Sequence, residues 1–309
     1  MTKTKKIVVS VLSALILIGV AVFSVSSLRM DAIYENISKA DPPELIADFE
    51  EKADDIVRVM SFNIRCANLG SVPAYARHSV VAETIINSNA DSFGVQEATP
   101  AWMKYLSSEL SDKYEYVGGG RNDGKNSGEY SAIFYLKEKY TKIDSGTFWL
   151  SETPDTPSKG WDASFKRICT WIVLEDNETG ERYVHLNSHF DHKGEEARLN
   201  SVDLILDKIS QYEDLPVVFT ADLNIKEGTA AYTRFVDSGI MSDTKYEAED
   251  TMNYLTFHDL APSQHENHII DYVMINDKFD AQVYKVVTAG IDGKYVSDHF
   301  PVYADLKLK

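Results

Sequence analysis

Residues 216–224 read Pro-Val-Val-Phe-Thr-Ala-Asp-Leu-Asn, an apolar run that ends in two polar residues, Asp222 and Asn224. The β-branched and aromatic residues of this run predict a short buried strand over 216–220, followed by a loop. A carboxylate at the end of an apolar strand loses hydration unless it binds a cation or hydrogen-bond donors. The segment therefore predicts that Asp222 and Asn224 belong to a polar site at the end of a buried strand.

The same arrangement of an apolar strand next to acids, amides or histidines occurs at five other places. These are Ser61-Phe62-Asn63, Gly94-Val95-Gln96-Glu97, Ser188-His189-Phe190-Asp191-His192, Ile270-Asp271-Tyr272 and Ser297-Asp298-His299-Phe300-Pro301. Each segment alone is weak evidence, because a single Asp-His pair is often a helix cap or a surface pair. All six in one chain are hard to ascribe to chance, and they predict one shared site.

Hydrophobic periodicity predicts more strands than helices. Strands are expected at 56–64, 92–96, 114–118, 130–136, 145–150, 168–175, 182–190, 216–220, 269–275, 282–288 and 301–307, and helices at 74–88, 195–212 and 228–238. The frequent hairpin signals favour antiparallel or mixed sheets with helices packed outside them. No linker rich in Pro, Gly or Ser interrupts residues 55–309, so we expect a single domain there.

The N-terminal region differs from the rest of the chain. Ile7 to Leu28 is a run of 22 residues without a charge, and three lysines precede it. This length suits a membrane span better than the shorter apolar core of a cleaved signal peptide. Residues 1–30 are predicted to be a signal anchor at the cell membrane that leaves the following domain outside the cytoplasm, and 31–54 a polar spacer. Cleavage at the small-residue step around Ser24, which would release a secreted protein, remains the alternative.

The charge balance bears on possible substrates. The formal net charge is −17, and residues 1–30 contain four basic and no acidic residues, so the exported part is still more negative. Such a surface repels polyanions unless a local basic cleft or bound cations offset it. Tight binding of nucleic acid is therefore disfavoured, although a metal-dependent hydrolase is not excluded. Cys66 and Cys169 are the only cysteines, and we expect two free thiols.

The order of the six segments resembles that of the DNase I-like endonuclease/exonuclease/phosphatase superfamily, and it extends from about Val57 to Asp305. The stretches Gly146 to Pro154, Gly160 to Asp162 and Arg167 to Trp171 resemble a bacterial subgroup whose substrates are poorly defined. The resemblance implies an α/β sandwich of two packed, mixed β-sheets flanked by helices. It also implies a divalent-metal-dependent phosphodiester hydrolase, a nuclease as the first interpretation, that cleaves a P–O bond by in-line attack of activated water.

The resemblance implies a metal site in addition. Glu97 matches the carboxylate that holds the divalent cation, Asn63 lies beside it, and Asp298 contributes to the metal or phosphate environment. Carboxylate and amide oxygens suit Mg²⁺, and Mn²⁺ is a possible substitute. The expected cofactor is therefore Mg²⁺.

Catalytic roles follow from the same matches. His299 resembles the histidine that activates water or stabilises the phosphate, with Asp271 as its partner. His189 resembles a second histidine on the leaving-group side, with Glu129 as the candidate residue that orients it. The remaining matches are Asp222 and Asn224, which position the water and hydrogen-bond the phosphate, and Arg167, which binds the phosphate.

One departure from the superfamily and two alternatives to a nuclease bear on the function. Arg65 stands where the abasic-site endonucleases of the superfamily have an aspartate, which argues against a DNA-repair role, as does export. Extracellular nucleic acid is the first choice of substrate, and the alternative is a lipid headgroup, a phosphoinositide or another small phosphorylated molecule. A non-catalytic binding module is disfavoured because the central acids and both histidines are present. No protein partner is predicted.

Overall fold

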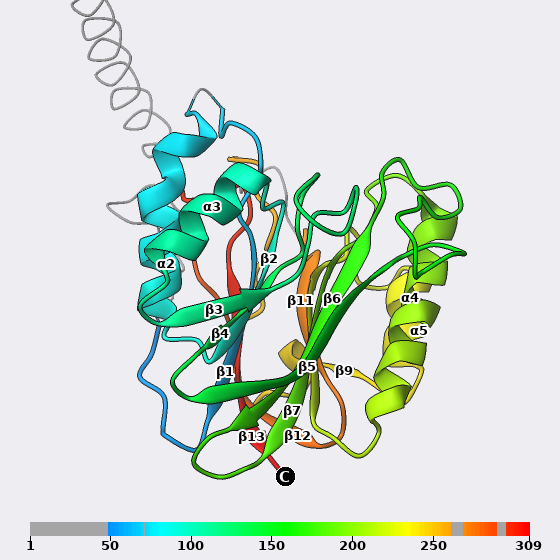
Figure 1. The fold of residues 1–309 in the computed structure, drawn as a ribbon. Helices are drawn as coiled ribbons and strands as arrows, with labels where there is room; N and C mark the ends of the chain where they lie inside the picture. The colour runs from blue at the N-terminus through cyan, green and yellow to red at the C-terminus, as the bar shows by residue number, and fades with distance from the viewer. Residues whose placement is uncertain (1–48, 71, 261–267, 289–294) are drawn as a thin grey trace, which may run out of the picture.

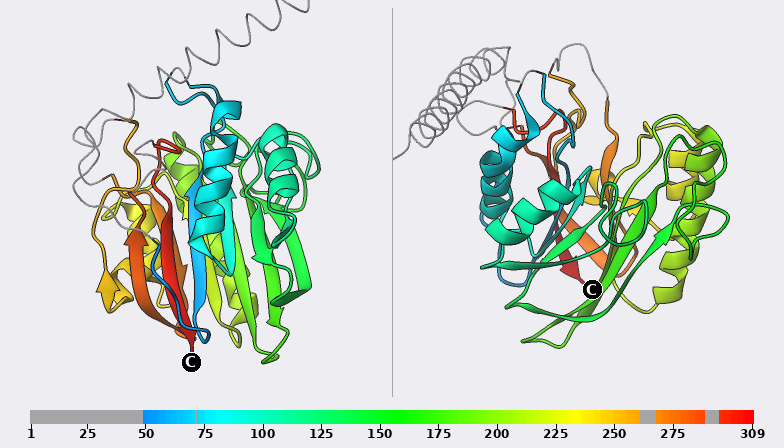
Figure 2. Two further views of the ribbon diagram at one scale, coloured as in Figure 1. Left: turned by 90° about the vertical axis from the view of Figure 1, so that its left-hand side faces the viewer. Right: turned by 45° about the horizontal axis from the view of Figure 1, so that its top comes forward.

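The computed structural model describes residues 49–70, 72–260, 268–288 and 295–309. Two β-sheets pack face to face, and helices cover the outer face of each sheet (Figure 1). Figure 2 shows the same two layers from two other directions. The predicted fold class, an α/β sandwich of two mixed sheets flanked by helices, is confirmed.

The first sheet has seven strands in the order β10-β12-β13-β1-β2-β4-β3. The strands are β1 (Val57–Asn63), β2 (Ser92–Gln96), β3 (Tyr114–Val117), β4 (Ile133–Leu136), β10 (Asp250–Thr251), β12 (Phe279–Val286) and β13 (Val302–Leu308). The β1/β2 and β10/β12 pairs are parallel and the other pairs antiparallel, so the sheet is mixed.

The second sheet has six strands in the order β5-β6-β7-β8-β11-β9. The strands are β5 (Tyr140–Trp149), β6 (Ile168–Asp176), β7 (Arg182–His189), β8 (Val217–Asp222), β9 (Ser242–Asp243) and β11 (Asp271–Ile275). Only the β7/β8 pair is parallel. The predicted hairpin at 168–190 is the β6/β7 pair.

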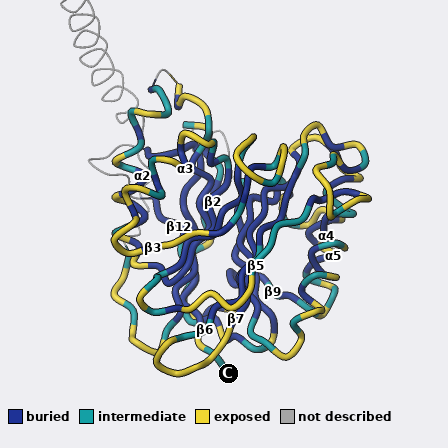
Figure 3. The backbone as a smooth tube through the Cα atoms, in the orientation of Figure 1, coloured by how far each residue is buried: buried dark blue, intermediate teal, exposed yellow. Residues whose placement is uncertain are grey.

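Helices lie outside the sheets. They are α2 (His78–Ser88), α3 (Pro100–Glu109), α4 (Glu195–Ile209), α5 (Ala230–Val236) and the short α6 (Thr244–Glu247), with 3₁₀ turns at Ala74–Arg77 and Ser210–Tyr212. In Figure 1, α2 and α3 cover the first sheet, while α4 and α5 cover the second. Because both faces of the central strands are covered, these strands are buried along their whole length (Figure 3).

The apolar side chains form three layers of core. One layer fills the space between the sheets and includes Val59 and Val218. A second packs α2 and α3 onto the first sheet, and a third packs α4 and α5 onto the second sheet. This packing holds the central strands rigidly, so side chains at the strand ends are placed reproducibly.

Strand direction brings the predicted site residues together. The parallel strands β1 and β2 end at Asn63 and Gln96, respectively, and these two residues are paired with each other. The parallel strands β7 and β8 end at His189 and Asp222, which are also paired. Strand β11 runs antiparallel to β8 and begins at Asp271, directly opposite Asp222. Five chain segments therefore meet at one edge of the sandwich.

The structure adds elements that sequence patterns did not reveal. Helix α3 was not predicted, although Thr99 and Pro100 are the expected cap and first residue of a helix, and the Thr99 side chain accepts a bond from Trp102 N. Helix α6 and the two-residue strands β9 and β10 were also missed, because elements this short carry no periodic signal. The predicted helix 195–212 is shorter and ends in a 3₁₀ turn.

Of the predicted N-terminal segments, the structure describes only the end of the spacer, from residue 49 onward. Residues 1–30 lie outside the described residues, and within the described ranges no helix is long and apolar enough to cross a bilayer. The end of the predicted spacer contacts the domain: the Phe49 ring packs against Tyr303, and Lys52 Nζ lies 2.9 Å from Asp91 Oδ2. Phe49 and Lys52 therefore contact the domain, whereas residues 50, 51, 53 and 54 are exposed, and the 31–54 spacer stays a prediction.

A buried ion pair makes the first sheet sensitive to substitution. Arg58 on β1 donates Nε and Nη2 to the two carboxylate oxygens of Asp305 on β13, at 2.6 and 2.7 Å. Asp305→Asn leaves the buried guanidinium without a counter-charge and is expected to lower the free energy of unfolding by about 3 kcal/mol. Denaturant titration measures this value. Lys307→Gln, which breaks an exposed pair with Asp55, is the control and should leave the midpoint unchanged. Equal midpoints for Asp305→Asn and the wild type would contradict the prediction.

Candidate active site

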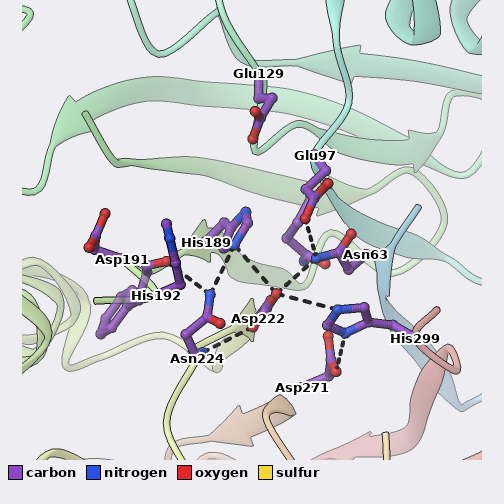
Figure 4. Close-up of polar contacts among 12 residues, drawn as sticks. Asn63, Glu97, Glu129, His189, Asp191, His192, Asp222, Asn224, Asp271 and His299 are labelled. Atoms are coloured by element: carbon purple, nitrogen blue, oxygen red, sulfur yellow. Dashed lines mark hydrogen bonds and ion pairs between the residues drawn. The ribbon is translucent and has the colours of Figure 1, made fainter. Parts of the chain in front are cut away.

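The site lies where the ends of β1, β2, β7 and β8 meet the beginnings of β11 and β13 (Figure 4). Three residues here have left-handed backbone conformations that non-glycine residues rarely adopt: Arg65 (φ 54°), Glu97 (φ 60°) and Asn224 (φ 50°). Such conformations cost free energy and persist where the surrounding structure fixes them, which is typical of functional sites. They turn the side chains of Glu97 and Asn224 into the site directly after their strands end.

Asp222 is the centre of the site. Its Oδ2 accepts from Asn63 Nδ2 at 2.8 Å, and its Oδ1 accepts from the backbone amide of Asn224 at 3.0 Å. Nε2 of His189 lies 3.4 Å and Nε2 of His299 4.0 Å from Asp222 Oδ2. Burial, followed by the Asp271 carboxylate, raises the pKa of Asp222 to about 7. This carboxyl group can therefore exchange a proton near neutral pH.

His299 and Asp271 form the predicted pair. His299 Nδ1 lies 2.8 Å from Asp271 Oδ2, and both side chains are buried. Burial alone would lower the pKa of His299, but the Asp271 carboxylate outweighs it and raises the pKa to about 10. The imidazole is therefore positively charged at neutral pH, with Nε2 directed toward Asp222.

His189 differs from His299 in charge. Burial, and then the nearby Arg167 and Arg121, hold the pKa of His189 well below its usual value, so its ring is neutral. Asn224 Nδ2 lies 3.0 Å from His189 Nε2 and also donates to Phe190 O at 3.1 Å. If Nε2 accepts from Asn224, the ring proton is on Nδ1.

Glu129 does not orient His189 as predicted. Its carboxylate accepts from Arg121 Nη1 at 2.7 Å, and the structure gives it no hydrogen bond to His189. The physical reason is that a guanidinium is a stronger partner for a carboxylate than a neutral imidazole. Glu129 still lies close by, since it lines a cavity of about 10 Å³ together with Arg121, Arg167 and His189.

Glu97 is an ionised carboxylate at the end of β2. Burial alone would raise its pKa, but hydrogen bonds from the Cys66 amide and thiol, and the charge of His299, lower it below the usual value. Oε2 accepts from Cys66 N at 2.8 Å, and Oε1 lies 3.3 Å from Asn63 Nδ2. Asn63 thus connects the two acidic groups, Glu97 and Asp222.

The predicted metal ligands carry oxygen donors of the kind that Mg²⁺ takes. Glu97 Oε1 lies 3.3 Å from Asn63 Nδ2, and Ser297 Oγ lies 2.7 Å from Asn63 O and 3.3 Å from Asp298 Oδ1, so oxygen ligands of the type that suits a hard divalent cation lie near one another. Two of these ligand oxygens have partners within the protein. Asn63 Oδ1 accepts a hydrogen bond from Arg65 N at 3.0 Å, and Asp298 Oδ2 forms an ion pair with the Arg65 guanidinium. Within the described residues, the acid and histidine side chains close enough to share an ion are Asp222, Asp271 and His299.

Arg167 presents a free donor to the same cavity. Its Nε lies 3.5 Å from Asp191 Oδ2 and its Nη2 lies 3.4 Å from His192 Nδ1. Its Nη1 is buried and has no hydrogen-bond partner among the described residues. A buried guanidinium N–H without a partner is costly, and a cavity of about 10 Å³ has room for one water molecule that could bond to it.

Sequence reasoning missed three contributors to the site. Arg65, identified only as a departure, reaches Asp298; Cys66 donates its amide to Glu97; and Arg121 binds Glu129. Arg65 and Cys66 could have been found from their positions, because they follow Asn63 by two and three residues at the end of a predicted strand. Arg121 lies in the loop between the predicted strands 114–118 and 130–136, and no motif in that loop indicated a role for it.

The family model described as "Endonuclease/Exonuclease/phosphatase family" matches residues 60–299. The chain belongs to this family. A solved structure of a family protein from Bacteroides vulgatus is 35% identical, with a TM-score of 0.78, and covers 82% of this chain and 99% of that one. A family protein from Bacteroides thetaiotaomicron is 34% identical, with a TM-score of 0.78 and coverage of 82% and 98%.

A third solved structure, described as a mannosyl-6-phosphatase of Bacteroides thetaiotaomicron, is 34% identical, with a TM-score of 0.76 and coverage of 81% of this chain and 99% of that one. The superfamily resemblance, inferred from the six segments, is thus confirmed, and so is the resemblance to bacterial members, inferred from the stretches between Gly146 and Trp171. As a family member, the chain is a hydrolase of the phosphoesterase and nuclease type.

Proposed function

We propose that this family member is a metal-dependent phosphoesterase that hydrolyses the P–O bond of small phosphate esters outside the cytoplasm. The observation that carries the proposal is the pairing of Asp222, whose pKa is near neutral, with the positively charged His299 beside the ionised Glu97. A proton acceptor and groups that neutralise a phosphate thus lie within one buried cluster.

Each side chain of the site has a separate role in the proposed reaction. Asp222 accepts the proton of the attacking water, and Asn224 fixes the Asp222 carboxylate through its amide. The charged His299, held by Asp271, donates to a phosphate oxygen, and the charge of the nearby buried Arg167 helps to offset the charge of the transition state. The water oxygen becomes bonded to phosphorus as the P–O ester bond breaks. The departing oxygen takes a proton from solvent on the His189 side and leaves as an alcohol, and Asp222 releases the proton of the attacking water to solvent.

Glu97, with Asn63 and Asp298, would hold the divalent cation. Mg²⁺ is the proposed ion and Mn²⁺ a substitute, because both prefer oxygen ligands. When bound, the cation supplies Lewis-acid stabilisation of the phosphate. Asn63 donates to both Glu97 and Asp222, so it links the proposed metal ligand to the proposed proton acceptor.

Small phosphate esters are favoured over nucleic acid, which reverses the order that the sequence alone suggested. The net charge of −17 disfavours a polyanion, and a small ester needs only the few cationic groups around the site. The similar protein described as a mannosyl-6-phosphatase supports a substrate of this size. Lipid headgroups belong to the same chemical class and suit a membrane-tethered enzyme.

The proposed location rests on residues 1–30 and has its own test. A signal anchor would keep the protein in the membrane fraction after high-salt and alkaline washing, with its original N-terminus. Recovery of a soluble form that begins near Ser27 would instead establish cleavage and secretion.

The proposed activity is tested by a substrate screen of the full chain in detergent. We expect release of inorganic phosphate from hexose 6-phosphates or glycerol phosphates in Mg²⁺ or Mn²⁺, and no release after chelation by EDTA. DNA, RNA and a simple phosphodiester serve as competing substrates. Preferential cleavage of DNA or RNA would restore the nuclease assignment, and equal rates with and without EDTA would refute metal dependence.

A further inference from the structure

Phe165 is an exposed aromatic side chain beside the catalytic cluster. Its ring is 48% exposed, and among the described residues it is the phenylalanine most open to solvent. The Arg121 guanidinium carbon lies 5.0 Å from the ring centroid, and the His192 ring stacks at 5.8 Å between centroids. The guanidinium lies over the ring and the imidazole is stacked on it, so the exposed part of the ring is bordered by polar groups that can contact a ligand.

Hydrogen bonds between three loops hold this ring in place. The Phe165 amide donates to Asp191 Oδ2 at 3.1 Å, which ties the loop before β6 to the loop after β7. Lys166 Nζ donates to Asn122 O at 3.1 Å, and Trp149 Nε1 donates to Arg121 O at 2.7 Å. Phe165 is therefore preorganised, which reduces the entropy lost when a ligand binds it.

The ring adjoins the His189 side of the catalytic cluster. Arg167 follows Phe165 by two residues, its guanidinium carbon lies 6.0 Å from the Phe165 ring centroid, and it lines the small cavity with Arg121 and His189. His299 and His189 both face Asp222, so a phosphate bound by His299 would have its ester oxygen near His189. The organic part of the substrate would then extend toward Phe165.

The polar neighbours of Phe165 have hydrogen-bonding capacity left over. Arg121 Nη1 donates a hydrogen bond to Glu129 Oε2, and the Arg121 side chain makes no other hydrogen bond within the described residues. His192 is exposed, and its Nδ1 faces Arg167 Nη2 at 3.4 Å, which puts the ring proton on Nε2 if Nδ1 accepts. Both residues can therefore donate to hydroxyl groups of a ligand that lies on the Phe165 ring.

We propose that Phe165, Arg121 and His192 form a ring-binding subsite for the alcohol part of the substrate, and that this part is a polyhydroxylated ring such as a hexose. The inference rests on the proposed function, which it extends to substrate specificity. The C–H face of such a ring packs on the phenylalanine, while its hydroxyl groups bond to the guanidinium and imidazole. An acyclic alcohol has no flat face and gains little there.

The test measures binding separately from turnover. Dissociation constants for hexose 6-phosphate, glycerol 3-phosphate and a nucleoside 5′-monophosphate are obtained by calorimetry on the full chain with EDTA. Phe165→Leu keeps the apolar volume but removes the flat ring, so we expect about 10-fold weaker binding of hexose 6-phosphate. Binding of glycerol 3-phosphate should be unchanged. Because Phe165 is exposed, the substitution does not perturb the core.

The control is Tyr246→Leu, which replaces a 65% exposed aromatic residue on α6 and should alter none of the three constants. The subsite is refuted if Phe165→Leu changes the hexose and glycerol phosphates equally, or neither. A loss confined to the nucleotide would refute the sugar assignment. Failure of the proposed function gives a different result: hexose 6-phosphate binds in a Phe165-dependent way but is not hydrolysed when Mg²⁺ is supplied.

Discussion

His299→Ala is expected to lower kcat by about 10²–10⁴-fold, the usual contribution of a positioned acid, base or charge-stabilising group. His299 is the buried cation that faces Asp222, and its charge depends on the 2.8 Å contact with Asp271. Asp271→Asn keeps the shape but removes the counter-charge, so it should cause a partial loss. Rates are measured on the ester found in the substrate screen.

His189 provides the comparison within this prediction. His189→Ala should also lower kcat, and the double variant should lose less than the product of the two single losses, because both side chains act in one transition state. His78→Ala is the matched control, since His78 stacks on Tyr105 outside the site. If both single variants fold and keep wild-type rates while the control does the same, the two-histidine mechanism is wrong.

Glu97→Gln is expected to reduce hydrolysis by about 10³-fold or more, because a catalytic cation supplies several kcal/mol of stabilisation. Glutamine can keep the hydrogen bond to the Cys66 amide, so the loop should stay in place while one anionic ligand is lost. Mg²⁺ affinity, measured by titration calorimetry, should fall together with the rate.

Glu129→Gln is the matched control for the metal measurement. It makes the same change in a second carboxylate near the cluster, but this carboxylate is bonded to Arg121. Mg²⁺ affinity should therefore be retained in Glu129→Gln. If Glu97→Gln binds Mg²⁺ as the wild type does, Glu97 is not a metal ligand.

Most long strands were predictable from local patterns. The predicted strand 92–96 coincides with β2, and β1 and β8 were predicted to within about two residues, as expected for element boundaries. The main failures have physical causes. Helix α3 has a mixed composition, with two buried aromatic or methionine side chains and one leucine, and its periodicity was too weak to notice. Strands β9 and β10 exist only because neighbouring strands pair with them.

The sequence predicted which residues belong to the candidate site, but not which of them contact each other. Asn63, Glu97 and Asp222 stand at strand ends in the sequence, where a buried polar group must find a partner. The pairing of Arg65 with Asp298 joins residues 233 positions apart, and no local pattern contains that information. Glu129 was assigned to His189 from the superfamily resemblance, and nothing in the sequence indicated that Arg121 would bond to Glu129 instead.

The sequence by itself determined the chemical types of the site residues, their order and their placement at strand ends, because apolar periodicity is a local property. Only the tertiary structure decided which side chains meet and what charge each carries. His299 and His189 are both buried histidines, yet one is charged and the other neutral. The difference arises because strand pairing sets Asp271 beside His299, whereas two arginines from separate loops lie near His189. Electrostatic free energy depends on distances through space, and the fold fixes those distances.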